Sequence, residues 1–255
     1  MKAQYLSAMQ QAWSRCEACQ LCQTRTNVVF GYGNPDAQVM IVGEAPGENE
    51  DRSGRPFVGQ AGMLLDQYLS QVSARDDVIS TAEELSSIKG KSAAAEQRRN
   101  ECRILLRDLL VQEFYFTNVV MCRPTDEEGG NRDPIPKEIE ACRSRLLEQI
   151  YTVDPVIIIA AGRIASEALI GKKLSITSAR GEIFDVEFRG RGLDIKYPVL
   201  AILHPSYLLR RNDFNQTGGE GEKTYYDLLR AMKIVDEYNK RHFGIPLPKR
   251  RPRRG

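Results

Sequence analysis

The segment GEAPGENEDRSGRPFVGQAG, residues 43–62, joins an apolar run to a helix and decides the fold. The run before it, VMIV at residues 39–42, is typical of a buried strand, and apolar side chains recur at helical spacing in residues 63–69. A connection between a strand and a helix usually needs about two to six residues. This one is longer and rich in glycine and proline, at the strand end where open α/β sheets bind ligands. It therefore predicts a binding site in an α/β domain.

Other parts of the chain predict the remaining sheet and its helices. Three further apolar runs have the length of strands: residues 114–120, 156–160 and 199–203. Helices are expected between and after them: residues 102–110, 137–151, 163–170 and 221–241. Nearly continuous apolar strands separated by helices indicate a parallel sheet covered on both faces. Residues 182–188 and 194–198 alternate between apolar and polar, which predicts a hairpin.

Length and composition favour one water-soluble domain. The chain has 255 residues, enough to bury a core. We expect residues 1–243 to form a single domain, with the polar, alanine-rich segment 73–100 as an insertion that is part helix and part mobile loop. No apolar stretch approaches the ~20 residues of a membrane span. The first residues also lack the pattern of a secretion signal. The expected location is therefore cytoplasmic, without a membrane partner.

Charge is unevenly distributed along the chain. The formal net charge is +2, yet no acidic residue follows Glu237, while seven lysines and arginines do. Residues 244–255 form a tail rich in proline and arginine. A basic tail on a mildly acidic body suggests a polyanionic partner such as nucleic acid. A solvated, disordered end explains the charge equally well.

The cysteines predict a metal or cluster site. The chain contains Cys16, Cys19, Cys22, Cys102, Cys122 and Cys142. The C-x-x-C pair Cys16 and Cys19, together with the distant Cys122 and Cys142, can close a tetrahedral site for zinc or for an iron–sulfur cluster. Their spacing does not separate these two metals. Cys22 competes as a ligand, and Cys102 is interpreted as structural. Burial as small hydrophobes would explain Cys122 and Cys142 but not the C-x-x-C.

Three polar side chains follow or end predicted strands. Glu44 follows the first strand, Asn118 ends the second and His204 follows the fourth. Because the carboxyl ends of parallel strands meet at one edge of a sheet, we expect these side chains to converge. The chain has only two histidines, and His204 opens a His-Pro-Ser sequence at this edge.

Several segments together resemble the family 4 uracil-DNA glycosylases, the group that carries a [4Fe–4S] cluster. They span most of the chain: residues 16–31, 43–62, 117–124, 140–143 and 204–210. The resemblance implies a three-layer α/β/α sandwich with a central four-stranded parallel sheet. It also implies that Cys16, Cys19, Cys122 and Cys142 hold the cluster and that Cys22 does not. The interval between Cys122 and Cys142 is longer than the family pattern, because of the acidic, glycine-rich residues 126–130.

The resemblance further implies a DNA repair enzyme that flips uracil out of DNA and hydrolyses its N-glycosidic bond, leaving an abasic site. Residues expected to bind the base are Gly43, Glu44, Ala45, Phe57, Asn118 and His204. Phe57 would stack on uracil, and the Asn118 amide would match its N3–H donor and O4 acceptor. His204 would stabilise negative charge at O2 of the departing base. Glu44 would orient water or favour the cationic sugar, although a carboxylate here can also cap a helix.

The segment after His204 is expected to face DNA. Ser206, Tyr207 and Arg210 would contact the strand, single or double, and Leu208 or its neighbour would fill the gap left by the flipped base. A helix start with Leu208 and Leu209 in the core is the equal alternative. We expect a monomer. A non-catalytic module that binds uracil-containing DNA or a protein partner on the same scaffold is the rival hypothesis for function.

Overall fold

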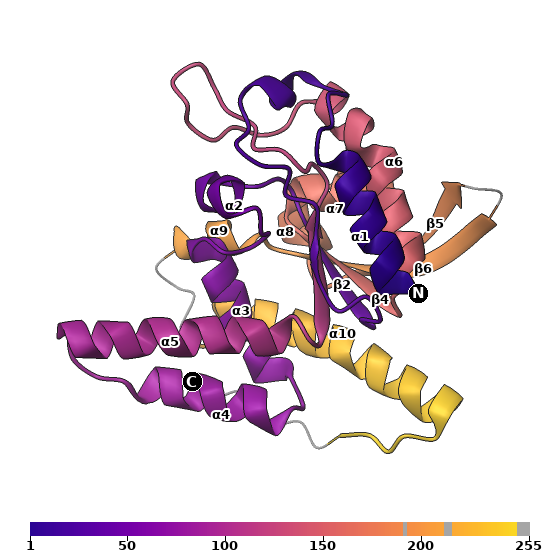
Figure 1. Cartoon of the computed structure of the whole chain (residues 1–255). Coiled ribbons are helices and arrows are strands. Elements are labelled where there is room, and N and C mark those ends of the chain that lie inside the picture. Colours follow the sequence, from indigo (N-terminus) through magenta and orange to yellow (C-terminus); the bar gives the residue numbers. More distant parts are fainter. Residues whose placement is uncertain (191–192, 212–215, 249–255) are drawn as a thin grey trace.

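A mixed β-sheet runs through the centre of the protein in the computed structural model, which describes residues 1–190, 193–211 and 216–248 (Figure 1). Within these residues the sheet has six strands in the order β1-β3-β2-β4-β6-β5. The strands are β1 (Tyr32–Gly33), β2 (Val39–Gly43), β3 (Phe114–Asn118), β4 (Ile157–Ala161), β5 (Ile183–Gly190) and β6 (Leu193–Ile202). The interior pairs β3–β2, β2–β4 and β4–β6 are parallel, whereas the edge strands β1 and β5 pair antiparallel to their neighbours.

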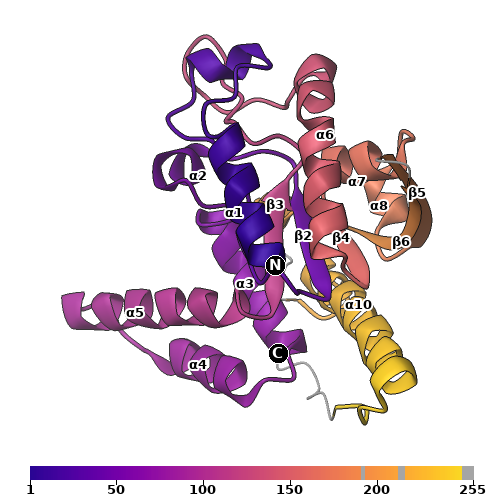
Figure 2. The same ribbon diagram turned by 45° about the vertical axis from the view of Figure 1, so that its right-hand side comes forward.

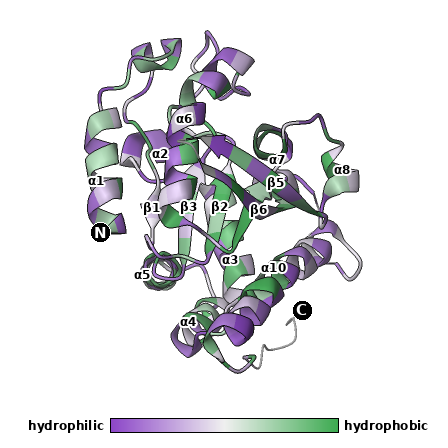
Figure 3. Ribbon diagram, turned by 90° about the vertical axis from the view of Figure 1, so that its right-hand side faces the viewer, coloured by the Kyte–Doolittle hydropathy of each residue, from purple (hydrophilic) through white to green (hydrophobic). Residues whose placement is uncertain are grey.

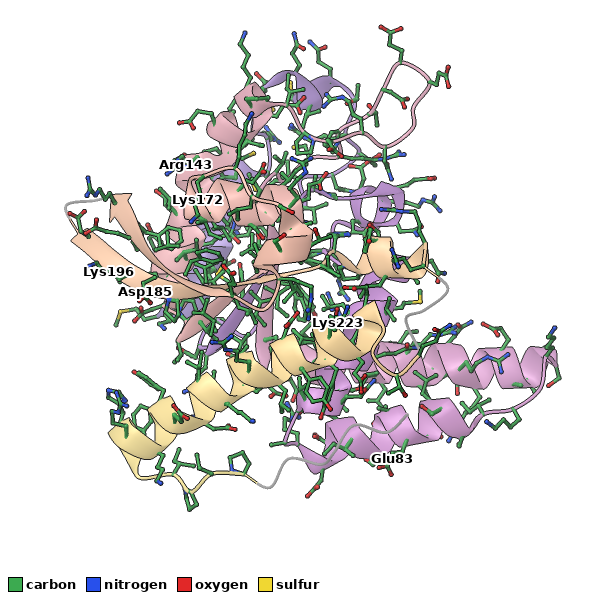
Figure 4. All side chains as sticks on the ribbon, turned by 180° about the vertical axis from the view of Figure 1, so that it is seen from behind. Glu83, Arg143, Lys172, Asp185, Lys196 and Lys223 are labelled. Atoms are coloured by element: carbon green, nitrogen blue, oxygen red, sulfur yellow. The ribbon has the colours of Figure 1, made fainter. Side chains whose placement is uncertain are left out.

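The α/β class is as predicted, but the sheet is larger and mixed. The expectation was four parallel strands, and both additional strands lie at the edges. β1 lies in the glycine-rich segment that precedes β2. It has only two residues, too few to show any periodicity. The predicted hairpin is present, but its second strand continues into the last apolar run, so that both belong to the single strand β6. Asp185 and Lys196, on β5 and β6, are exposed (Figure 4), and such charges discourage pairing of this edge with another chain.

Helices cover both faces of the sheet (Figures 1 and 2). The longer helices are α1 (Lys2–Trp13), α3 (Gln60–Val72), α4 (Asp76–Ser87), α5 (Ala93–Leu110), α6 (Pro136–Val153), α7 (Arg163–Ile170) and α10 (Glu220–Phe243). The shorter ones are η1 (Gln20–Gln23), α2 (Glu48–Ser53), α8 (Ile176–Ala179) and α9 (Pro205–Leu209). The helix α2, inside the long loop that follows β2, had no counterpart in the prediction.

Two hydrophobic clusters lie on opposite sides of the sheet because successive strand residues point to opposite faces. In β2, Ile41 packs with residues of α3, α5 and α10, whereas Met40 and Val42 pack with residues of α1, α6 and α7. Every residue of β2, β3 and β4 is buried, as expected of strands covered on both sides. Figure 3 shows the apolar colour concentrated on the central strands and on the helix faces turned toward them. The two clusters hold the strand ends, and the residues that follow them, in fixed positions.

The predicted insertion is a helical hairpin. Residues 73–100 were expected to be part helix and part mobile loop, but α4 and the first eight residues of α5 occupy most of them, with only residues 88–92 between the two. Ser92 caps α5 by accepting a hydrogen bond from the backbone N–H of Ala95 (3.2 Å). Figures 1 and 2 show α4 and α5 side by side, with their connecting end pointing away from the sheet. Cys102, predicted to be structural, is buried on α5.

The C-terminal part of the chain is described only in part. The helix α10 contains Lys240 and Arg241, and its C-cap Gly244 begins the predicted basic tail. Residues 249–255, which hold most of the basic charge of this tail, lie outside the described residues. Among the helices that the structure describes, none combines the length and the apolar character needed to cross a membrane.

Candidate active site

A cavity of about 750 Å³ opens at the carboxyl edge of the sheet. This volume is within the range of small-molecule binding sites. The predicted site residues that line it are Glu44, Ala45, Phe57, Asn118, His204, Ser206, Tyr207 and Arg210. They come from the loop after β2, the end of β3 and the segment after β6. The structure thus brings together residues that are up to 166 positions apart, because Gly43 and Asn118 are paired at the ends of parallel strands.

Gly43 marks the point where the aromatic ring and the amide approach each other. A Cβ atom added to Gly43 would lie 2.4 Å from Oδ1 of Asn118 and 2.6 Å from Cζ of Phe57. No side chain fits there without displacing one of the two. Asn118 is 4% exposed and lines the cavity, and its amide forms no hydrogen bond to any other described residue. Its atoms are not among the fully buried ones that lack a partner, so the amide faces the cavity and is available to a ligand there.

Phe57 adopts a backbone conformation that is rare for a residue with a side chain. Its φ angle is +57°, in the left-handed region. The close approach of helix α3 requires Gly62, where an added Cβ would lie 1.9 Å from the carbonyl oxygen of Phe57. The ring of Phe57 packs at 5.9 Å from that of Phe116 and belongs to the core, while also lining the cavity. Such strain persists only where the surroundings determine the conformation.

His204 presents a neutral imidazole to the cavity. Its Nδ1 accepts a hydrogen bond from the backbone N–H of Ser206 (3.1 Å) and lies 2.7 Å from the Ser206 hydroxyl. This contact caps α9 and leaves the ring proton on Nε2. Burial, and next the charge of Arg210, lower the pKa of His204 from 6.5 to about 4. At neutral pH the side chain is therefore an uncharged donor through Nε2.

Glu44 is a carboxyl that holds its proton unusually strongly. Burial, and next the charge of Asp133, raise its pKa from 4.5 to about 7, and the charge of Arg163 opposes the rise. A carboxyl group with a pKa near the working pH is suited to proton transfer. The sequence prediction placed Glu44 at this site but contained no reason for the raised pKa.

Asp133 and Arg163 are cavity residues that the sequence reasoning missed. Both line the cavity, and Arg163 Nη2 donates to Asp133 Oδ2 at 3.1 Å. Arg163 follows the end of β4 by two residues, so its position at the same sheet edge as Glu44 was a usable signal. Asp133 lies in the loop after Cys122, and no pattern in the sequence links it to the site.

The segment after His204 combines cavity residues with core residues. Ser206 and Tyr207 are half-buried and Arg210 is exposed, and all three border the cavity. Leu208 is fully buried in the core, so of the two alternatives considered for it the core position is correct. Leu209 is 42% exposed and is the neighbour that reaches the surface.

The four predicted cysteine ligands lie in one region beside α6. Cys122 and Cys142 are buried, and Cys16 and Cys19 are half-buried. Burial, which outweighs the opposing charge of Arg25, raises the pKa of Cys122 to about 11, and the charges of Cys142 and Cys19 contribute to the rise. Cys142 and Cys16 likewise help to raise the pKa of Cys19, after the larger effect of burial. The four thiols thus lie in the same neighbourhood, although among the described residues no three possible ligands are gathered closely enough to hold a metal ion.

A buried arginine lies next to these thiols. Arg145 is fully buried on α6, one turn after Cys142, whereas Arg143 is exposed (Figure 4). Nη2 of Arg145 donates to the backbone carbonyls of Asn118 (3.3 Å) and Val119 (2.8 Å), but Nε and Nη1 of Arg145 have no partner among the described residues. Unpaired buried cationic donors beside four thiols are complementary to an anionic group held by those thiols.

The long loop between Cys122 and Cys142 is closed by its own hydrogen bonds. Oδ1 of Asp126 accepts from the backbone N–H groups of Glu128 (3.1 Å) and Gly130 (2.6 Å). Arg132 forms a two-pronged ion pair with the buried Glu138 at the start of α6 (2.6 and 2.9 Å). The residues that lengthen the interval beyond the family pattern therefore form a closed turn.

Comparison with known proteins gives a consistent result. Residues 30–229 match the uracil DNA glycosylase superfamily. A type-4 uracil-DNA glycosylase of Thermotoga maritima is 38% identical over 197 residues, which cover 77% of this chain and 79% of that protein. One of Archaeoglobus fulgidus is 31% identical over 84% of this chain and 94% of its own length. A third, from Sulfurisphaera tokodaii, is 35% identical over 75% of this chain and 73% of that protein.

Proposed function

This chain belongs to the uracil DNA glycosylase superfamily and, within it, to the type-4 uracil-DNA glycosylases, and from this premise we propose that it removes uracil from DNA by hydrolysing the N-glycosidic bond. The observation that carries the proposal is the convergence of Glu44, Phe57, Asn118 and His204 on one cavity. The product would be an abasic site, the starting point of base excision repair. Such an enzyme acts on the DNA of its own cell and is therefore intracellular.

Recognition of the base depends on Phe57 and Asn118. A base inside a duplex is out of reach, so the enzyme takes it into the cavity. There the Phe57 ring stacks on the flat face of uracil, and the Asn118 amide accepts from N3–H and donates to O4. Cytosine presents the opposite pattern at these two atoms and pairs less well. The Asn118 amide lines the cavity without a hydrogen bond to another described residue, and its closeness to the Phe57 ring at Gly43 also supports this assignment.

Bond cleavage depends on His204 and Glu44. As the bond between N1 of uracil and C1′ of the sugar breaks, its electron pair leaves with the base, and negative charge gathers at O2. The Nε2–H donor of neutral His204 stabilises that charge at no cost of protonating the ring. Glu44 in its ionised form takes a proton from the water whose oxygen bonds to C1′. Ala45 lines the cavity beside Glu44, whereas Gly43 does not line it and instead makes room for the Asn118 amide and the Phe57 ring.

Contacts with the DNA strand are assigned to Ser206, Tyr207 and Arg210, next to the cavity. Leu209 is the exposed apolar side chain available to fill the gap left by the flipped base. The basic tail from residue 244 would add attraction to phosphates without sequence preference. We propose that residues 1–243 act as one domain and as a monomer, with β3, β2, β4 and β6 as the central parallel strands of an α/β/α sandwich.

A [4Fe–4S] cluster held by Cys16, Cys19, Cys122 and Cys142 is proposed as the cofactor. The donor set, four thiols in one neighbourhood beside the unpaired donors of Arg145, supports it. When bound, the cluster would supply a rigid cross-link between the N-terminal segment and α6. Zinc is the alternative metal, and because d¹⁰ zinc has no visible band, absorption near ~400 nm would exclude it.

The function is tested on oligonucleotides carrying one uracil, either unpaired, opposite guanine or opposite adenine. Abasic sites are revealed as strand breaks after alkali, and an oligonucleotide with cytosine at the same position is the control. We expect breaks only with uracil, and their loss in His204→Ala. Binding of the uracil strand without abasic sites would instead favour the non-catalytic module.

A further inference from the structure

The helical hairpin α4–α5 reaches the base-stacking residue through one side chain. Arg107, on the last turn of α5, donates from Nη2 to the carbonyl oxygen of Pro56 at 2.7 Å. Its Nη1 donates to Oδ1 of Asp66 on α3 at 2.7 Å. Its guanidinium carbon lies 3.9 Å from the centre of the Phe116 ring, the same ring that packs against Phe57. One guanidinium therefore contacts both the backbone before Phe57 and the ring beneath it.

These contacts bear on the strained part of the loop. The carbonyl that Arg107 binds belongs to the residue immediately before Phe57, whose φ of +57° needs support from its surroundings. On the other side, the missing side chain of Gly62 leaves room for the carbonyl of Phe57 itself. The conformation of Phe57 is thus held from both sides. Of these two supports, Gly62 belongs to α3, and only Arg107 belongs to the segment between α3 and β3.

The ion pair of Arg107 is poorly explained by stability alone. The side chains of Arg107 and Asp66 are only 12% and 10% exposed, and burial raises the pKa of Asp66. Desolvation of two charges commonly offsets their attraction, so a buried pair contributes little net stability compared with apolar residues. It does fix geometry, because the planar fork of arginine can bind two acceptors and stack on a ring at once. Lysine has no such fork.

We propose that Arg107 is a positioning residue that holds Phe57 in its stacking orientation, so that the hairpin α4–α5 is part of the base-binding apparatus. The proposal rests on the proposed function, because it requires that Phe57 stacks on uracil. Arg107 lies in the predicted helix 102–110, which directly follows the segment 73–100 that the sequence identified only as an insertion. Arg107 acts through Pro56 and Phe116 and does not line the cavity.

The test uses two variants of Arg107 and one matched control. Arg107→Lys keeps a positive charge opposite Asp66, which preserves the fold. It lacks the second N–H donor that binds the carbonyl oxygen of Pro56. The double variant Asp66→Asn with Arg107→Gln removes both charges, so that no unpaired charge is buried. Arg103→Met is the control, because Arg103 lies one turn earlier on α5 and pairs with the exposed Glu96. For each, the melting temperature, kcat and KM on a single-stranded uracil oligonucleotide, and inhibition by free uracil are measured.

We expect both Arg107 variants to weaken inhibition by uracil and to lower kcat/KM by about tenfold, as partial loss of base stacking would. Arg103→Met should change neither by more than about twofold. In a Phe57→Ala background, Arg107→Lys should cause no further loss of uracil affinity, because the two changes remove the same interaction. Additive losses, or unchanged uracil affinity in both Arg107 variants, would overturn the proposal. Failure of the wild-type protein to release uracil would refute the proposed function instead.

Discussion

Replacing Glu44 by glutamine should stabilise the folded protein above pH 7 while removing most of its activity. Burial and the charge of Asp133 raise the pKa of Glu44 from 4.5 to about 7. A carboxyl whose pKa rises on folding binds its proton more tightly in the folded state. The free energy of unfolding therefore falls as the pH rises from about 4.5 to about 7, and stays lowered above that. Glutamine has nearly the same shape but no charge to desolvate. In Glu44→Gln the free energy of unfolding therefore does not fall with pH for this reason.

The size of the effect follows from the two pKa values. The rise from 4.5 to about 7 corresponds to ~3 kcal/mol at 1.36 kcal/mol per pKa unit. Glu44 is only half-buried and keeps part of its water, which reduces the expected gain to ~2 kcal/mol. For a chain of this length the melting temperature of Glu44→Gln should exceed that of the wild type by about 4–8 °C at pH 8. The difference should shrink as the pH falls toward 5.

Two measurements from pH 5 to pH 8 test this reasoning. Urea unfolding of both proteins gives the stability difference, which should grow with pH. With a single-stranded uracil substrate, kcat/KM of the wild type should rise about tenfold per pH unit up to about 7 and then level off. The pKa of His204, about 4, lies below this range. Glu44→Gln should be slower by about 10²–10⁴-fold and lack this rise. Parallel stability curves, or the same rise in the variant, would refute the assignment of the raised pKa to Glu44.

Three further substitutions are informative. Gly43→Ala should weaken inhibition by free uracil at least about tenfold, because the new Cβ would lie 2.4 Å from Asn118 Oδ1. The same crowding should lower the free energy of unfolding by about 1–3 kcal/mol. Unchanged inhibition would contradict the pocket geometry. His204→Ala should lower kcat for abasic-site formation by about 10²–10³-fold with little change in KM. Cys142→Ser should lose visible absorption near ~400 nm, whereas Cys22→Ser should keep it, and equal loss in both would contradict the ligand set.

Much of the site was predictable because it depends on strand ends. The runs that became β2, β3 and β4 are mostly apolar, which identified them as strands covered on both faces. Once their order as parallel strands was assumed, the convergence of Glu44, Asn118 and His204 followed from topology alone. The structure brings these residues together at one cavity. Their chemical roles stay predictions until the variants are assayed.

The features that escaped prediction depend on contacts between distant segments. The strand β1 has only two residues and exists because Tyr32 and Gly33 pair with β3. The raised pKa of Glu44 depends on burial and next on the charge of Asp133, whose loop reaches the cavity from the region of the cysteines. Arg107 lies in a segment whose composition gave no sign of a link to the site. Hydrophobic periodicity identifies elements, but it carries no information on which polar side chains meet across them.

The candidate site gathers costly features at one edge of an otherwise conventional fold. It contains a left-handed phenylalanine, a carboxyl with a raised pKa and an amide without a partner among the described residues. Each of these lowers stability, and each would find its partner or its use only when a base occupies the cavity. The two hydrophobic clusters on either side of the sheet supply the stability that tolerates them. Substitutions that relieve these costs should therefore stabilise the protein and impair it together, as Glu44→Gln is expected to do.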